Sequence, residues 1–99
     1  MKLLTKEIKE KLPKLHETDG KEKNFVVKFF TPDANWTWYA VEGQQEEDDF
    51  IFFGLVIGLE KEWGYFSLRD LETIRGKLGL PVERDRFYSV EKFREHEAS

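Results

Sequence analysis

Four runs of apolar residues between positions 24 and 68 hold most of the aromatic rings of this chain. Residues 50–58 are apolar at both sets of alternate positions, a pattern typical of a strand that is covered on both faces. Residues 24–30 carry Lys28 on one face, so that face is expected to be partly wet. We therefore predict that 50–58 forms the central strand, with Gly54 and Gly58 marking a bulge or a close backbone approach.

The segments between the four runs predict how the strands are connected. None is long enough for a parallel crossover, which needs about a dozen residues. Residues 31–35 form a turn by their chemistry, because Pro32 fixes φ and cannot donate to a ladder. Residues 43–49 are expected to form a longer, acidic and solvated loop, and 59–62 close the last hairpin. The sequence predicts a four-stranded antiparallel β-meander.

Helical patterns flank the predicted meander. Residues 4–12 repeat apolar positions every four residues, and Thr5 is available as the N-cap. Residues 68–75 follow a capping-box pattern that starts at Ser67. A third helix is predicted over 89–97, with Val90 and Phe93 inward, which completes an α+β fold of two or three short helices packed on the meander.

Composition limits the class of protein. The chain has 99 residues, no cysteine and a net charge of −4, so disulfides and thiolate metal sites are absent. Its start lacks the apolar stretch of a signal peptide, and no stretch approaches a membrane span. We expect a single soluble domain, 1–99, in the cytoplasm.

Charge is unevenly distributed along the chain. Residues 24–68 hold two Lys and eight Asp or Glu, whereas 1–23 have a surplus of two positive charges and 69–99 are balanced. An acidic sheet disfavours nucleic acid as a partner across its face. The acidic run Glu46, Glu47, Asp48 and Asp49 could instead mimic a phosphate backbone and bind a basic groove, or could be an ordinary solvated loop.

Two further segments are candidate binding sites. Trp36 and Trp38 lie two residues apart, so their indoles share one strand face, either as a stacking platform together with Tyr39 or as part of the core. Arg84 and Arg86 could bind a phosphate or a carboxylate. The competing interpretation of that cluster is a local ion-pair network with Glu83 and Asp85.

Catalytic signatures are missing from the sequence. It has no Gly-x-Ser-x-Gly turn and no P-loop. His16 and His96 are isolated histidines without the spacing of a zinc site. A hydrolase that uses Glu83 and Asp85 is the weakest hypothesis, and no cofactor or metal is indicated. The sequence therefore favours a non-enzymatic role.

Several segments together resemble, in order and spacing, a family of small bacterial proteins catalogued only as a domain of unknown function. The resemblance covers nearly the whole chain but brings no activity, cofactor or catalytic residue. It implies an accessory protein of mobile DNA, such as plasmids, phages and conjugative elements, that counters or tunes host machinery. The segments that carry it are Met1-Lys2-Leu3-Leu4-Thr5, Lys11-Leu12-Pro13, Lys28-Phe29-Phe30-Thr31-Pro32, Asn35-Trp36-Thr37-Trp38-Tyr39-Ala40, Phe53-Gly54-Leu55-Val56, Gly64-Tyr65-Phe66-Ser67-Leu68 and Leu80-Pro81-Val82-Glu83-Arg84-Asp85.

Two hypotheses of function follow. The first is a protein-interaction module of a mobile genetic element that binds host or element machinery through an acidic and aromatic surface. The alternative is a ligand or single-stranded nucleic-acid binding module, in which Trp36, Trp38 or Tyr39 stacks while Arg84 and Arg86 supply charge. The sequence leaves the identity of the partner, the oligomeric state and the exposure of the indoles open.

Overall fold

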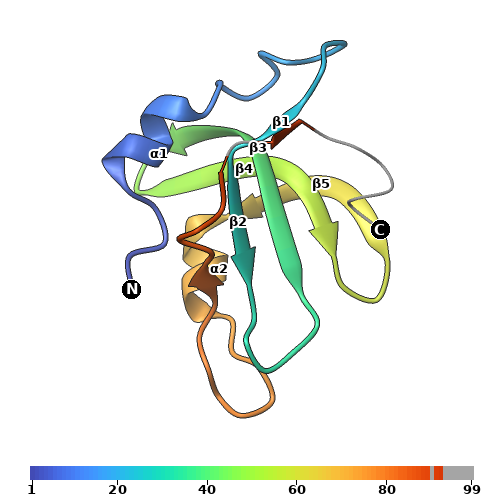
Figure 1. Cartoon of the computed structure of the whole chain (residues 1–99). Coiled ribbons are helices and arrows are strands. Elements are labelled where there is room, and N and C mark those ends of the chain that lie inside the picture. The colour runs from blue at the N-terminus through green and yellow to red at the C-terminus, as the bar shows by residue number, and fades with distance from the viewer. Residues whose placement is uncertain (90, 93–99) are drawn as a thin grey trace.

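A five-stranded antiparallel sheet is the centre of the structure, a computed structural model that describes residues 1–89 and 91–92 (Figure 1). The strand order is β5-β4-β3-β2-β6. The predicted meander is confirmed as β2 to β5, and β6 adds a fifth strand beside β2. These strands are β2 (Val27–Phe30), β3 (Thr37–Glu46), β4 (Asp49–Ile57), β5 (Lys61–Ser67) and β6 (Glu83–Arg84).

A second, two-stranded sheet pairs β1 (Asn24–Phe25) with β7 (Glu91–Lys92). The single strand predicted over 24–30 is therefore broken at Val26, which turns Phe25 onto the opposite face of the main sheet from Phe29. The helix predicted over 89–97 is wrong at Glu91–Lys92, because pairing with β1 overrides the local helical pattern. Val90 and Phe93 lie outside the described residues.

Two six-residue helices pack on one face of the sheet, called here the helix face. Helix α1 (Lys6–Lys11) begins at Thr5, whose Oγ1 accepts from the backbone N of Ile8 at 3.2 Å. Helix α2 (Leu68–Thr73) begins at Ser67, whose Oγ accepts from the backbone N of Asp70 at 3.0 Å. Both predicted caps are confirmed, and both helices end earlier than predicted. No described helix is long and apolar enough to cross a membrane.

The core lies on both faces of the sheet. The helix face buries the larger cluster, which includes Phe29, Trp38 and Phe52, beneath the two helices. The opposite face, called the outer face, buries Val41 and Leu55 in a smaller cluster. Strand β4 is covered on both faces, as predicted, but β3 and not β4 occupies the centre of the sheet.

Strand β3 is longer and less regular than its sequence pattern predicts. A β-bulge between Ala40 and Glu42 inserts Val41 as an extra residue, opposite Gly54. A Cβ on Gly54 would lie 1.8 Å from the backbone oxygen of Tyr39, which confirms the predicted close backbone approach there. At Gly58, by contrast, the close neighbour is a side chain, the indole of Trp36.

The acidic loop predicted over 43–49 is a tight hairpin instead. Strand β3 continues to Glu46 and β4 begins at Asp49, so only Glu47 and Asp48 form the turn. The apolar start of β4 pairs with residues 43–46, and this ladder outweighs repulsion among the acids. The side-chain amide of Gln45 donates to the carbonyls of Glu47 and Asp49 at 2.9 and 2.8 Å and closes the turn.

Candidate functional site

Three loops meet at one end of the sheet, and we call this region the loop end. It consists of residues 31–36, 58–60 and 74–80, in the lower part of Figure 1. The indole of Trp36 packs on Gly58, where an added Cβ would come within 2.4 Å of the ring. Asp33 joins the first loop to the third, because its Oδ2 accepts from the backbone N of Leu78 at 2.6 Å and of Leu80 at 3.3 Å.

The loop end exposes apolar side chains. Leu59 is 96% exposed, Leu78 is 81% exposed and Trp36 is 41% exposed, and Leu80 is also exposed. These four make up half of the eight large apolar side chains that are exposed in the described part of the chain. Exposed apolar residues that are scattered singly need no explanation, but a contiguous group marks an interaction site.

A groove of about 710 Å³ opens on the helix face beside the loop end. A six-residue helix is about 9 Å long, whereas ten-residue β3 spans about 33 Å, so α2 leaves part of this face uncovered. We call this space the indole groove. Its walls are largely apolar, and the charged residues Asp70, Arg75 and Lys77 also line it. The apolar lining residues include Ala34, Trp36, Trp38, Phe66, Leu71 and Ile74.

The predicted aromatic segment does not form one platform. Trp36 and Trp38 stack with their ring centroids 6.1 Å apart, but Trp38 is only 5% exposed and belongs to the core. Tyr39 lies on the outer face, where it stacks on Phe25 at 4.9 Å. The structure therefore leaves Trp36 as the one indole of this segment that is open to a ligand or partner.

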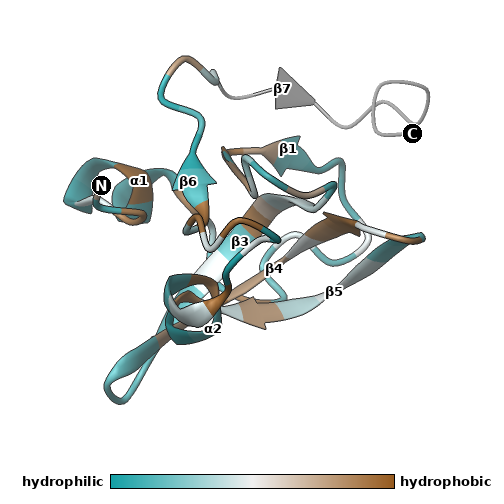
Figure 2. Ribbon diagram, turned by 90° about the horizontal axis from the view of Figure 1, so that it is seen from below, coloured by the Kyte–Doolittle hydropathy of each residue, from teal (hydrophilic) through white to brown (hydrophobic). Residues whose placement is uncertain are grey.

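The acidic hairpin lies at the other end of β3 from the loop end. Figure 2 shows its hydrophilic tip projecting beside α2. Glu46 and Glu47 are exposed at this tip. Asp48 forms an ion pair with Arg69, with the carboxylate oxygen 2.8 Å from the guanidinium nitrogen. This hydrogen bond lowers the pKa of Asp48 and raises the pKa of Arg69.

Asp49 also braces the hairpin against α2. Its Oδ1 accepts from the backbone N of Phe50 at 2.7 Å and of Arg69 at 3.1 Å. Burial alone would raise the pKa of Asp49, but these hydrogen bonds outweigh burial and the pKa is lowered. Asp49 therefore stabilises the fold, whereas Glu46, Glu47 and Asp48 are exposed at the tip.

The predicted arginine cluster divides as well. Arg84 is occupied by the N-terminal segment, because its Nη1 donates to the backbone oxygens of Lys2 and Leu3. Arg86 is exposed. Asp85 accepts from the backbone N of Phe87 at 3.0 Å and so stabilises a turn. These contacts favour the interpretation of Arg84 and Asp85 as structural groups.

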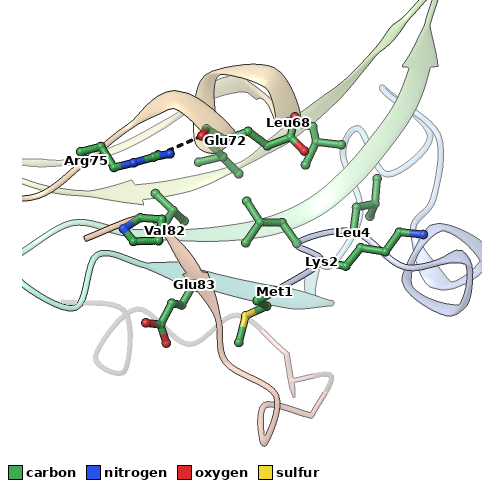
Figure 3. A pocket seen from close by; sticks show the side chains of 11 residues that line it. Met1, Lys2, Leu4, Leu68, Glu72, Arg75, Val82 and Glu83 are labelled. Atoms are coloured by element: carbon green, nitrogen blue, oxygen red, sulfur yellow. Dashed lines mark hydrogen bonds between the residues drawn. The ribbon is translucent and has the colours of Figure 1, made fainter. Parts of the chain in front are cut away.

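A second cavity, of about 520 Å³, lies between the N-terminal segment, α2 and residues 81–83 (Figure 3). Its interior is apolar, with Leu4, Leu68 and Val82 among its lining residues. Arg75 donates to the backbone oxygen of Glu72 at 2.9 Å, and the carboxylate of Glu83 points away from the cavity in Figure 3.

Glu42 is a buried carboxylate that the sequence reasoning missed. It is 2% exposed, and its oxygens accept from the backbone N of His16 at 2.9 Å and of Thr18 at 3.0 Å, and from the Thr18 hydroxyl. Burial alone would raise its pKa, but the hydrogen bonds from Thr18 and His16 outweigh burial and the pKa is lowered. The one available signal was an acid within an apolar run, and the bulge at Val41 turns this acid onto the outer face.

Histidine and metal chemistry add no further site. The ring of exposed His16 lies 3.3 Å from a carboxylate oxygen of Asp19 and 3.4 Å from the hydroxyl of Tyr65. His96 lies outside the described residues. Across residues 1–89 and 91–92, no group of three His, Cys, Asp or Glu side chains is placed to hold a metal ion.

Comparison with known proteins identifies the family. Residues 3–94 match the profile of a family described as "Protein of unknown function (DUF2958)". The chain belongs to this family. The resemblance expected from the sequence is thus confirmed, and the DUF2958 profile covers the sheet, both helices and the loop end. No curated protein and no solved structure matches this DUF2958 chain significantly. Its function must be argued from its own geometry.

Proposed function

We propose that this DUF2958 domain is a non-enzymatic protein-interaction module that contacts its partner with the loop end. The observation that supports the proposal is the grouping of Trp36, Leu59 and Leu78 on three adjoining loops beside the indole groove. Loops that are positioned by a rigid sheet are common sites of binding. Aromatic anchors that enter pockets carry much of the energy of protein interfaces.

The lining of the indole groove suggests the chemistry of the partner. The apolar walls fit an aromatic or aliphatic side chain. Arg75 and Lys77 outnumber Asp70 in the lining, which favours a carboxylate next to that side chain. We therefore expect a partner segment that combines an apolar anchor with an acidic residue. That the partner belongs to host or mobile-element machinery stays a prediction from the family resemblance.

The hairpin tip offers a second, electrostatic contact. Glu46 and Glu47 are exposed and lie far from the loop end along β3. A basic partner surface would be steered towards them, with an effect that weakens in salt. The acidic and aromatic surface expected from the sequence is therefore two surfaces, and each needs its own test.

The test compares three variants in capture from host lysate, after each is shown to fold. Leu59→Ser combined with Leu78→Ser removes the two most exposed leucines of the loop end. Phe87→Ser is the matched control, because Phe87 is equally exposed but lies outside the loop end. We expect the double variant to bind a specific partner about tenfold more weakly or to lose it, and the control to keep it.

Two outcomes would contradict the proposal. A partner that the leucine variant keeps, but that Glu46→Gln combined with Glu47→Gln loses, would place the contact at the hairpin tip. Quenching of tryptophan fluorescence by single-stranded DNA, lost in Trp36→Ala, would favour the nucleic-acid alternative. An unchanged spectrum at low salt would count against stacking on Trp36.

A further inference from the structure

The two edges of the main sheet are protected to different degrees. Strand β6 has only two residues, both charged, and follows Pro81 closely. Short charged strands and prolines are the usual means by which proteins block further pairing at an edge. Strand β5, at the other edge, has seven residues and an unbroken register with β4.

Strand β5 lacks most of the features that block an edge. It contains no proline and no bulge, and its charges, Lys61 and Glu62, stand at its start. Trp63 and Tyr65 are exposed on the outer face. Within the described part of the chain, β4 is the only strand that pairs with β5. Figure 2 shows β5 at the margin of the sheet. Such an edge is a template for an added strand.

We infer that the outer edge of β5 pairs antiparallel with β5 of a second copy of this chain, around a two-fold axis at Gly64. Gly64 is the middle residue of the strand, so this register pairs all seven residues with a partner. The resulting interface is isologous, as in most homodimers. The two five-stranded sheets would form one continuous antiparallel sheet.

Side-chain chemistry favours this register. Trp63 of each copy lies opposite Tyr65 of the other, and aromatic cross-strand pairs stabilise antiparallel ladders. The rings of Trp63 and Tyr65 already lie 5.9 and 5.0 Å from the ring of Phe53. The dimer would therefore extend an existing aromatic row across the two-fold axis.

The charged residues of β5 do not oppose this pairing. In the register centred on Gly64, Lys61 lies opposite Ser67, and Glu62 lies opposite Phe66. No like charges face each other, so the pairing lacks the repulsion that usually protects an edge. The self-complementary pattern is our reason for choosing a second copy of the chain over an unrelated strand.

The dimer and the proposed function share part of one strand, because Tyr65 and Phe66 of β5 also line the indole groove. The exposed apolar residues of the loop end, Trp36, Leu59 and Leu78, lie outside β5. An antiparallel pair would place the two loop ends at opposite ends of the joint sheet, so that both can bind. Partner capture by the leucine variant and cross-linking of Gly64→Cys are therefore separate measurements, and neither leucine lies in the strand that pairs.

A cysteine scan tests the register directly, because the chain has no cysteine of its own. A Cβ on Gly64 would meet no atom within 4 Å, so Gly64→Cys is tolerated. Directly opposed residues have their Cα atoms about 4.5–5.5 Å apart, within the range of a disulfide. Glu62→Cys is the matched control, because in this register two such thiols would be about 14 Å apart.

The expected result is a disulfide-linked dimer of Gly64→Cys under mild oxidation. A thiol held in place has an effective concentration on the order of millimolar. At micromolar protein this variant should cross-link about 1000-fold faster than Glu62→Cys. Cross-linking of Glu62→Cys at the same or a higher rate, or slow cross-linking of both variants, would overturn the proposed pairing.

Sedimentation equilibrium gives an independent measurement on the wild-type chain. We expect a mass twice that of the 11.8-kDa chain, and a monomer for Tyr65→Glu, which replaces the aromatic pair and places a carboxylate opposite the indole of Trp63. Phe87→Ser should remain a dimer. A wild-type chain that stays monomeric at every concentration would overturn the inference, whatever its partner-binding activity.

Discussion

Glu42 and Asp33 each hold a loop in place by accepting backbone N–H groups, but they use their oxygens differently. Glu42 engages both oxygens, and so fixes the loop 14–23. Asp33 uses only Oδ2, which accepts from Leu78 and Leu80 in the loop 74–80. Its Oδ1 is buried and has no hydrogen-bond partner among the described residues. One carboxylate is fully satisfied and the other is only half satisfied.

The two loops also differ in the side chains that they expose. Loop 14–23 is largely polar. Loop 74–80 carries exposed Leu78 and belongs to the loop end. A buried acceptor without a partner costs free energy. Asp33 therefore holds loop 74–80 more weakly than Glu42 holds loop 14–23. Binding loops commonly come from the less stable parts of a fold. The comparison predicts that a substitution of Glu42 lowers the free energy of unfolding more than a substitution of Asp33 does.

Glu42→Gln should have the largest effect on stability. An amide nitrogen would replace one carboxylate oxygen and face an N–H donor of His16 or Thr18. We expect a loss of about 2–3 kcal/mol in the free energy of unfolding, measured by urea denaturation at neutral pH. Glu17→Gln removes the same charge from an exposed position in the same loop, and should leave stability unchanged.

The stability that Glu42 provides should depend on pH. Because the pKa of Glu42 is lowered in the folded state, its contribution is fully present above its ordinary pKa of 4.5. The contribution is lost as the pH falls below that value, through the lowered pKa of the folded state. The difference between wild type and Glu42→Gln should therefore shrink in acid. A constant difference would show that the carboxylate charge is not the cause.

Gly76→Ala tests the hydrogen bonds of Asp33 by steric means. An added Cβ would lie 1.5 Å from Oδ1 of Asp33, so the carboxylate must move and release the N–H groups of Leu78 and Leu80. We expect a loss of about 1–2 kcal/mol and faster amide hydrogen exchange at those two residues. This loss is smaller than that of Glu42→Gln because one oxygen of Asp33 has no bond to lose.

Gly64→Ala is the control for a glycine substitution. A Cβ at Gly64 would meet nothing within 4 Å. Alanine is a better strand residue than glycine, so stability should stay the same or rise slightly. If Gly64→Ala and Gly76→Ala destabilise the domain equally, contact with Asp33 does not explain the loss at Gly76.

Local patterns in the sequence were sufficient for most of the fold. The alternation of apolar residues predicted β2 to β5, and short polar motifs predicted the caps Thr5 and Ser67, because each depends on neighbours within a few residues. The errors arose where pairing with another strand, and not the local sequence pattern, determines the structure. Strand β7 forms because β1 is available beside it, and β3 extends to Glu46 because β4 offers a partner.

The candidate site was harder to predict than the fold. Leu59 and Leu78 are single apolar residues in turns, and no local pattern shows that their loops meet beside Trp36. The bulge at Val41 reverses the face on which Glu42 lies, so simple alternation places that carboxylate wrongly. Trp36 and Trp38 share a face as predicted, but the helices decide which of the two is covered. Sites assembled from several loops depend on tertiary contacts that spacing does not encode.

Among Glu42→Gln, Gly76→Ala and Asp33→Asn, we expect Asp33→Asn to lower the free energy of unfolding least. The amide oxygen can still accept hydrogen bonds from the N–H groups of Leu78 and Leu80. The new NH₂ group replaces an oxygen that has no hydrogen-bond partner to lose. Only the assistance of the charge is removed, so we expect a loss below about 1 kcal/mol. Asp33→Ala removes the acceptor itself and should cost more than Asp33→Asn in the same urea titration. If Asp33→Asn costs as much as Glu42→Gln, the two carboxylates hold their loops equally strongly, and the unpartnered oxygen does not make the loop end the weaker side of the domain.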